Sequence, residues 1–245
     1  MKRASKAEIS LIRKLKRKKY RLALGLFLVE GEKSVTEFLS TGLRLKDVFL
    51  EEGLEFSFNH EGKVMDSKSM KEVSSLANPP GVLAVFEIPK QGVFSPQNPS
   101  LILDGIVDPG NAGTLIRLAD WYGVEQVVAL EGTVDFYNPK TIQSSMGSLG
   151  RIQVFNGSNS SFLERMNEVL DSVFIADLNG EGPSVLKSEA LHLVIGSESH
   201  GPSEFWNQTS AKRVFIGRPE GRVTESLNAA VSGGILLEAW KGLGT

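Results

Sequence analysis

Residues 101–107 read LILDGIV, residues 108–113 read DPGNAG, and residues 114–122 read TLIRLADWY. The first run is apolar and of strand length, the second is rich in turn-forming residues, and the third has apolar side chains at helical spacing. A strand, a short loop and a helix in this order form the first half of a parallel crossover unit. We therefore predict an α/β fold built on a parallel sheet.

The same alternation continues along the rest of the chain. Further strand-like runs occur at 125–130, 151–155, 172–177, 191–196 and 212–216. Helical stretches separate most of them, which favours a parallel sheet covered by helices. Such folds bind ligands outside the carboxyl ends of their strands, so we expect functional residues in the loops that follow strands.

The region before residue 90 has its own set of elements. Its pattern predicts helices at 6–20, 33–39 and 67–76, and strands at 26–29, 47–50, 63–65 and 81–88. Three prolines, one glycine and little apolar content over 89–99 are typical of a linker. We predict a small domain over 1–90, a linker over 91–99 and a second domain over 100–245.

Composition excludes several functional classes. The chain has 245 residues, 41% hydrophobic and 23% charged, as in an ordinary globular protein. It has no Cys, which excludes disulfides and a thiol nucleophile, and its three His lack a metal-ligand spacing. No apolar run reaches the roughly 18 residues of a membrane span, and no signal-peptide cleavage site follows the basic start. We expect a cytoplasmic protein with no metal and no membrane partner.

Charge is unevenly distributed along the chain. Residues 1–21 hold ten Lys and Arg against one acid, Glu8, although the formal net charge of the whole chain is only -2. A basic arm on an acidic body indicates contact with a polyanion such as RNA. The alternative is that these cations only form the water-exposed face of a helix.

The loop after the strand at 101–107 supplies two candidate residues. Asn111 stands where a helix N-cap is expected. Arg117 lies about 200° around the helix from Leu115, so it points away from the apolar face. The alternative is that Asn111 only caps the helix and Arg117 only solvates it.

Two later loops also follow strands. Residues 196–202 read GSESHGP and residues 217–224 read GRPEGRVT. Glycine at a strand end lets a ligand approach the backbone closely. The second loop leads into a helical stretch, 225–240, whose interior Gly233 and Gly234 fit either a ligand or a closely packed helix.

No loop matches a known phosphate cradle or hydrolase motif. The sequence contains neither G-x-G-x-x-G after the first strand of either half nor G-x-x-x-x-G-K-[ST], and its His residues lack a G-x-S-x-G partner. The sequence therefore does not favour a dinucleotide oxidoreductase, a P-loop NTPase or a serine hydrolase. His200 reads as an ordinary loop residue.

Together and in order, the three loops resemble the signature motifs of the SpoU (TrmH-like) RNA 2'-O-ribose methyltransferases of the SPOUT superfamily. The resemblance is carried by 108–117 (DPGNAGTLIR), 195–201 (IGSESHG) and 226–228 (SLN), and 135–147 is similar as well. Residues before 90 resemble the family's substrate-binding domain, which is similar to ribosomal protein L30e.

The resemblance implies a fold, a cofactor and partners. It implies a C-terminal domain with a parallel sheet and a deep trefoil knot, preceded by a smaller L30e-like α/β domain, and it implies a homodimer. The implied cofactor is S-adenosyl-L-methionine, held in the family largely by loop backbone. The matching cofactor positions here are Leu130, Gly196, Ile216 and Leu227.

The resemblance also implies five catalytic-site side chains. Arg117 is the residue assigned to the 2'-hydroxyl, and because a guanidinium does not deprotonate in a protein we expect it to stabilise the developing alkoxide. Asn111 and Asn228 are expected to orient the ribose or neighbouring loops. Glu198 is expected to hold Arg117 or the knot, and Ser226 to lie near the methyl group.

We therefore predict an S-adenosylmethionine-dependent enzyme that methylates a ribose 2'-hydroxyl. We expect ribosomal RNA of the 23S type as the substrate, because a separate N-terminal domain is the arrangement of the family's ribosomal enzymes, and tRNA is the alternative substrate. One alternative is a non-catalytic protein on the same fold, which would bind RNA but not the cofactor. Another is a nucleotide-binding metabolic enzyme, which would bind an adenine nucleotide but not RNA.

Overall fold

The computed structural model describes residues 2–57, 60–221, 223–224 and 226–242. The chain divides into two compact units, which we call unit 1 and unit 2. Unit 1 contains residues 1–90 and 135–150, and unit 2 contains residues 91–134 and 151–245. Residues 135–150, which the sequence assigned to the second domain, thus fold with the first.

Unit 1 is built on a four-stranded sheet of order β1-β4-β2-β3. Its strands are β1 (Leu26–Glu30), β2 (Leu45–Glu51), β3 (Lys63–Met65) and β4 (Val82–Glu87). Its helices are α1 (Lys6–Leu15), α2 (Lys18–Leu24), α3 (Glu32–Ser40), α4 (Ser67–Val73), α6 (Pro139–Ser145) and the 3₁₀ turn η1 (Ser148–Gly150). β4 is antiparallel to β1 and β2, and β3 is parallel to β2. All four strands predicted before residue 90 are confirmed.

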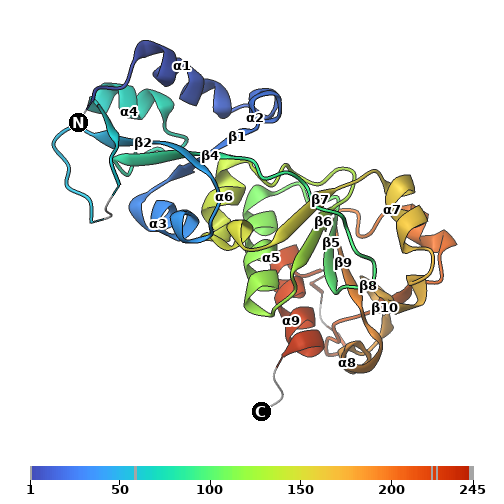
Figure 1. Cartoon of the computed structure of the whole chain (residues 1–245). Coiled ribbons are helices and arrows are strands. Elements are labelled where there is room, and N and C mark those ends of the chain that lie inside the picture. Colours follow the sequence, from blue (N-terminus) through green and yellow to red (C-terminus); the bar gives the residue numbers. More distant parts are fainter. Residues whose placement is uncertain (1, 58–59, 222, 225, 243–245) are drawn as a thin grey trace. The chain divides into compact units, whose positions relative to one another are not determined.

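The edge strand β1 is buried on both of its faces. Leu26 and Leu28 belong to the core that α1 and α4 cover, and in Figure 1 these two helices run along one face of the sheet. Phe27 points the other way, because side chains alternate along a strand. Its ring centroid lies 5.7 Å from that of Phe38 in α3 and 5.0 Å from that of Tyr137. Tyr137 therefore ties residues 135–150 into the core of unit 1.

The basic arm forms two helices and not the single helix predicted over 6–20. Arg17 separates α1 from α2 with an extended backbone, φ -103° and ψ 130°. Arg21 stabilises the bend, because its Nη1 donates to the carbonyls of Leu15 and Lys16, each at 2.9 Å. Helical periodicity did not reveal this break, since basic side chains suit an exposed helix on either side of it.

Arg21 is a buried cation and not part of an exposed arm. Its side chain is 2% exposed, and its Nη2 lies 2.5 Å from Oδ2 of Asp135. The other carboxylate oxygen of Asp135 accepts a hydrogen bond from the backbone N of Tyr137 at 3.0 Å. Arg21 therefore adds no exposed charge to the basic arm, and its ion pair connects residues 135–150 to α2.

Unit 2 contains a six-stranded sheet of order β10-β8-β9-β5-β6-β7, parallel throughout, which confirms the predicted α/β class. Its strands are β5 (Ser100–Asp104), β6 (Gln126–Ala129), β7 (Gln153–Asn156), β8 (Val173–Glu181), β9 (His192–Gly196) and β10 (Lys212–Val214). Its helices are α5 (Pro109–Trp121), α7 (Asn159–Met166), α8 (Leu186–Glu189) and α9 (Ala229–Lys241), with 3₁₀ turns η2 (Leu170–Ser172), η3 (Pro183–Val185) and η4 (Glu204–Gln208).

Helices α5 and α9 pack directly on each other (Figure 1). A Cβ atom added at Gly233 of α9 would lie 2.3 Å from Cδ2 of Leu115 in α5. Glycine at this position therefore lets the two helices approach. Of the two explanations that the sequence left open for Gly233, close helix packing is the one that the contacts support.

Part of the predicted linker packs onto unit 2. Phe94 belongs to the buried core, and the Gln126 side chain hydrogen-bonds the backbone of Ser95 and Asn98 at 3.0–3.1 Å. The difference from the prediction arises because one aromatic residue and buried polar side chains of the sheet anchor a segment whose composition otherwise resembles a linker.

His192 makes the stability of unit 2 depend on pH. Its side chain is fully buried, with Nδ1 2.7 Å from Oγ of Ser100 and Nε2 3.0 Å from the carbonyl oxygen of Pro96. Burial lowers the pKa of His192 from 6.5 to about 4. The folded protein therefore keeps this ring neutral over a range in which the unfolded chain takes up a proton. Its effect on stability is absent above about pH 6.5 and grows as the pH falls towards 4.

We expect this group to remove about 3 kcal/mol of unfolding free energy between about pH 6.5 and pH 4. His192→Gln, whose amide keeps a donor for Pro96, should show a shallower loss over the same range. Urea unfolding followed by Trp fluorescence reports on unit 2, because all three Trp of the chain (Trp121, Trp206 and Trp240) lie in it. Parallel pH profiles for wild type and variant would contradict the assignment.

Candidate functional site

The loop after β5 begins α5 earlier than the sequence predicted. Asp108 is the N-cap, its carboxylate accepts a hydrogen bond from the backbone N of Asn111 at 2.8 Å, and Pro109 occupies the first helical position. The prediction that Asn111 caps this helix is therefore wrong. Pro at the first position fixes the start of the helix three residues earlier, and the Asn111 side chain is left available for contacts outside α5.

Glu198 joins three separate segments of unit 2. Its Oε1 accepts hydrogen bonds from Nδ2 of Asn111 at 2.9 Å, from the backbone N of Ala229 at 2.9 Å, and from Nδ2 of Asn228. Nδ2 of Asn228 also lies 3.0 Å from Oδ1 of Asn111. We call these three side chains the Glu198 network. One carboxylate thus connects the start of α5, the loop after β9 and the start of α9.

Asn228 has a second role at the start of α9. Its Oδ1 accepts from the backbone N of Ala230 and of Val231, so it is the N-cap. The helix therefore begins at Ala229, inside the helical stretch predicted from residue 225. With its amide nitrogen on Glu198 and its oxygen on α9, Asn228 fixes the helix relative to the loop.

Arg117 lies apart from the Glu198 network. Its side chain is exposed, and it forms no hydrogen bond or ion pair with another residue of the described ranges. Glu198 was expected to hold Arg117 or the knot, and its hydrogen bonds are to Asn111, Asn228 and the backbone of Ala229 and not to Arg117. A guanidinium with no structural partner among these residues is available to a ligand.

A cavity of about 830 Å³ opens within unit 2 at the carboxyl ends of β9 and β10. Its wall comes from β8, the two loops after β9 and β10, and the first turns of α9. Five of the nine predicted site residues line it, namely Gly196, Glu198, Ile216, Ser226 and Leu227. The other four, Leu130, Asn111, Arg117 and Asn228, are not among its lining residues.

Leu130 belongs to the hydrophobic core. It is 3% exposed and packs with the cluster that includes Phe155 and Trp206. Its backbone N donates to the carbonyl of Leu103 at 2.9 Å, and its own carbonyl accepts from Thr133. These contacts hold the end of β6 beside β5.

Asp104 positions the loop that carries Glu198, and the sequence analysis missed it. This carboxylate is 1% exposed and accepts from the backbone N of Ser203 at 2.7 Å, from Ser203 Oγ at 2.6 Å and from Nε1 of Trp206 at 3.0 Å. The available signal was an acid at the end of an otherwise apolar strand. A buried acid must have partners, but the sequence did not identify them.

Charged groups at the cavity were also missed. Arg213 forms an ion pair with Asp177, and Arg218 donates to the carbonyl of Thr224. Apolar lining such as Ile195 and Leu236 accompanies these charges, so the cavity suits a ligand that combines an apolar ring with charged ends. Residue 222 of the predicted loop 217–224, and residue 225 at the start of the predicted helical stretch, lie outside the described residues.

The part of the chain that the structure describes was compared with the side-chain clusters that hold metals and with the helices that span membranes. Within it, no three His, Asp or Glu side chains gather in a way that would hold a metal ion. No helix there combines the length and the apolar composition needed to cross a bilayer.

Comparison with known proteins gives matches over both units. The model of the SpoU rRNA Methylase family matches residues 98–238, and that of the MRM3-like substrate binding domain matches residues 6–84. The chain is 28% identical over 236 residues to the 23S rRNA (guanosine(2553)-2'-O)-methyltransferase RlmP of Bacillus subtilis, which covers 94% of each chain.

Solved structures agree over nearly the whole chain. A putative RNA methyltransferase of the TrmH family from Porphyromonas gingivalis has a TM-score of 0.84 and 32% identity, covering 97% of this chain and 98% of that one. The AdoMet-bound rRNA methyltransferase from Sinorhizobium meliloti has a TM-score of 0.81 and 26% identity, covering 98% and 96%. Since the family model alone matches more than half of the residues, this chain belongs to the SpoU rRNA methylase family.

Proposed function

We propose that this protein transfers a methyl group from S-adenosyl-L-methionine to a ribose 2'-hydroxyl of ribosomal RNA. The observation that carries the proposal is the Glu198 network, which brings the three family motifs together beside a cavity of about 830 Å³. The RlmP protein is named for 2'-O-methylation of 23S rRNA, and the S. meliloti enzyme was crystallised with AdoMet. Both names support this choice of substrate and cofactor.

The residues of the cavity fit the proposed cofactor. Its volume lies within the roughly 300–1,000 Å³ usual for small-molecule sites. Ile216 and Leu227 offer apolar contact to a purine ring, and the charged groups at Asp177 and Arg213 suit the ionised ends of an amino acid. Gly196 lines the same cavity, whereas Leu130 does not, so we propose Gly196, Ile216 and Leu227 as cofactor contacts. When bound, the cofactor supplies an activated methyl group on a sulfonium.

The chain's own residues position and stabilise the reacting oxygen. We propose that the exposed Arg117 guanidinium donates hydrogen bonds to the 2'-oxygen as negative charge develops on it. Asn111 and Asn228 hold the loops through Glu198, which is a positioning role. Ser226 lines the cavity and is proposed to face the methyl group.

The basic arm is proposed to bind RNA with only part of its cations. Arg3 and Arg13 form ion pairs with Glu52 and Glu72, and Arg21 is buried. In this arm, the exposed cations whose side chains form no hydrogen bond, ion pair or ring contact with the described residues are Lys2, Lys6, Arg17, Lys18 and Lys19. Contacts from these side chains to phosphates would make RNA affinity fall steeply with salt.

Three finer features of the family are also proposed here. These are a trefoil knot in the C-terminal part of unit 2, an L30e-like fold for residues 1–90, and a homodimer. Exposed apolar side chains on α5 and α9 support the dimer, with Trp121 79%, Val231 51% and Ile235 41% exposed. Arg117 does not line the cavity of its own chain, which agrees with a site completed by a second copy.

The test is transfer of radiolabelled methyl from S-adenosylmethionine to ribosomal RNA and, separately, to tRNA. We expect label in ribosomal RNA as alkali-resistant 2'-O-methyl linkages. Label in tRNA alone would show that the substrate is tRNA and not ribosomal RNA. RNA binding with neither cofactor binding nor label would favour the non-catalytic RNA-binding protein. Adenine-nucleotide binding without RNA binding would favour a metabolic enzyme.

A further inference from the structure

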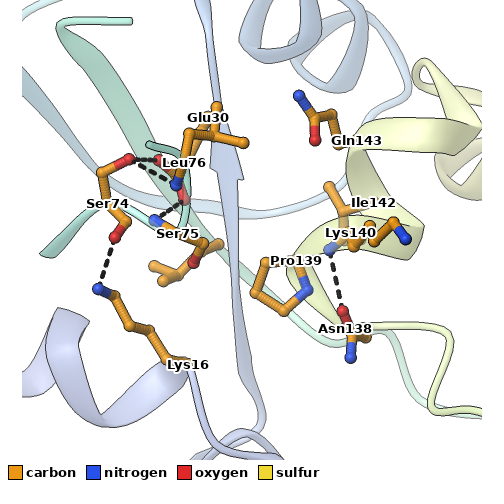
Figure 2. A pocket seen from close by; sticks show the side chains of 11 residues that line it. Lys16, Glu30, Ser74, Ser75, Leu76, Asn138, Pro139, Lys140, Ile142 and Gln143 are labelled. Atoms are coloured by element: carbon orange, nitrogen blue, oxygen red, sulfur yellow. Dashed lines mark hydrogen bonds between the residues drawn. The ribbon is translucent and has the colours of Figure 1, made fainter. Parts of the chain in front are cut away.

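A second pocket, of about 550 Å³, lies entirely within unit 1. Its walls are the end of α1, strand β1, residues 74–76 and the helix α6 (Figure 2). Lys16, Glu30 and Ser74 lie on one side of the view, and Pro139, Ile142 and Gln143 of α6 lie on the other. None of the predicted catalytic or cofactor residues lines it.

The pocket combines an apolar floor with a polar rim. Leu28 and Ile142 are each 1% exposed and form part of the floor, and the Pro139 ring adds a rigid apolar surface. Glu30, Ser75 and Gln143 bring hydrogen-bonding groups to the same space. A nucleobase has this same division, with apolar faces and polar edges, and proteins that recognise single-stranded RNA insert unpaired bases into such surfaces.

Glu30 and Lys16, at the rim, are held in place by hydrogen bonds and can each form further hydrogen bonds. Glu30 accepts from Ser74 Oγ at 2.5 Å and from Ser75 N at 2.8 Å, one bond to each oxygen, so each oxygen has a further lone pair. Nζ of Lys16 donates to the carbonyls of Glu72 at 2.9 Å and Ser74 at 2.5 Å, which leaves its third N–H. Both groups are therefore preorganised as an acceptor and a donor.

Charge around the pocket suits a nucleic acid more than an uncharged ligand. Lys16 and Lys140 both line it, and Lys16 is followed directly by the exposed cations Arg17, Lys18 and Lys19. The phosphates of a single RNA strand can contact these cations while one base of that strand is unstacked and enters the pocket. The pocket thus continues the basic surface that we propose to bind RNA.

We propose that this pocket receives one unpaired nucleoside of the substrate RNA, with the base on the floor formed by Leu28 and Ile142. Glu30 accepts from N–H groups on the base edge, and Lys16 donates to a carbonyl or ring nitrogen. The inference rests on the proposed RNA substrate but concerns a site separate from the cavity of unit 2. It gives unit 1 a recognition function besides its general attraction to phosphates.

The direction in which one substitution changes RNA affinity distinguishes this proposal from attraction by charge alone. Glu30→Gln removes a negative charge, so phosphate attraction alone predicts tighter RNA binding. The pocket predicts weaker binding, because the amide places a donor where the base also presents donors. Glu55→Gln is the matched control, since Glu55 is an exposed acid of unit 1 that does not line the pocket. Gln143→Trp fills the mouth from an exposed position of α6.

The experiment uses the full chain with in vitro transcribed ribosomal RNA at fixed salt. Filter binding gives the RNA Kd, calorimetry gives S-adenosylmethionine affinity, and methyl transfer gives kcat and KM. We expect Glu30→Gln and Gln143→Trp each to weaken the RNA Kd by about 10-fold. We also expect KM for RNA to rise, with kcat and cofactor affinity close to wild type. Glu55→Gln should bind RNA as tightly as wild type or more so.

The possible failures are distinguishable. If wild type methylates RNA and both pocket variants keep its RNA Kd, the pocket inference is overturned and the proposed function stands. Tighter binding by Glu30→Gln, equal to that of Glu55→Gln, also overturns it. If wild type binds no RNA, both proposals fail. Circular dichroism of each variant confirms that its fold is retained, and the exposed Gln143 position keeps the test valid if Glu30→Gln is unstable.

Discussion

Arg117→Ala should lower kcat for methyl transfer by about 100- to 1,000-fold, the range found when one donor to a developing oxyanion is removed. The melting temperature should stay unchanged, because Arg117 is exposed and bonds to no other residue in the described part of the chain. A large loss of kcat without a loss of stability would show that Arg117 serves the reaction and not the fold. The assay is single-turnover methyl transfer at saturating RNA and cofactor, with melting followed in parallel.

Two further variants make this result specific. Arg117→Lys keeps the charge but loses the planar, forked donor set, so it should recover only part of the activity. Arg165→Ala removes an exposed arginine from α7 of the same unit and should leave kcat close to wild type. Near-native turnover by a folded Arg117→Ala protein would remove Arg117 from the chemistry. An equal loss in Arg165→Ala would show that the effect comes from general charge.

The architecture of unit 2 could be predicted because it depends on local patterns. Apolar runs of strand length alternate with helical stretches, and parallel strands place the loops after them at one edge of the sheet. The sequence pattern thus identified the loops 108–113 and 196–202, which contain Asn111 and Glu198, but it placed Asn228 within a helical stretch. It did not show that Glu198 would bond both amides, because that pairing joins positions 87 and 30 residues apart.

The errors arose where tertiary contacts override local preference. Asn111 is a good N-cap by type, but Asp108 followed by Pro109 starts the helix first. Residues 135–150 follow a strand of unit 2 in sequence, yet Tyr137 packs in the aromatic core of unit 1. Arg21 looks like every other cation of a polybasic run, and only its pairing with Asp135 distinguishes it. No periodicity carries that information.

Among the cations of the basic arm, Arg21 should be the one whose replacement by Ala destabilises the fold most. Both members of the Arg21–Asp135 pair are nearly buried, with side chains 2% and 9% exposed. Removing the guanidinium leaves a buried carboxylate without its partner, which costs about 3–5 kcal/mol in comparable pairs. It also removes the donor to the carbonyls of Leu15 and Lys16. Neutralising exposed Lys18 or Lys19 should instead change stability by less than about 0.5 kcal/mol.

The effect should be local to unit 1, and the chain provides an internal reference. Hydrogen exchange should speed up in α2 and in residues 135–150, whereas Trp fluorescence reports only on unit 2 because no Trp lies in unit 1. Unchanged exchange in 135–150 would contradict the role given to the pair. Arg21→Met combined with Asp135→Asn should lose less stability than the sum of the two single changes, since no charge is then left buried alone.

Lys16 and α6 line the pocket of unit 1, so Arg21→Ala should also weaken RNA binding at temperatures where unit 2 remains folded.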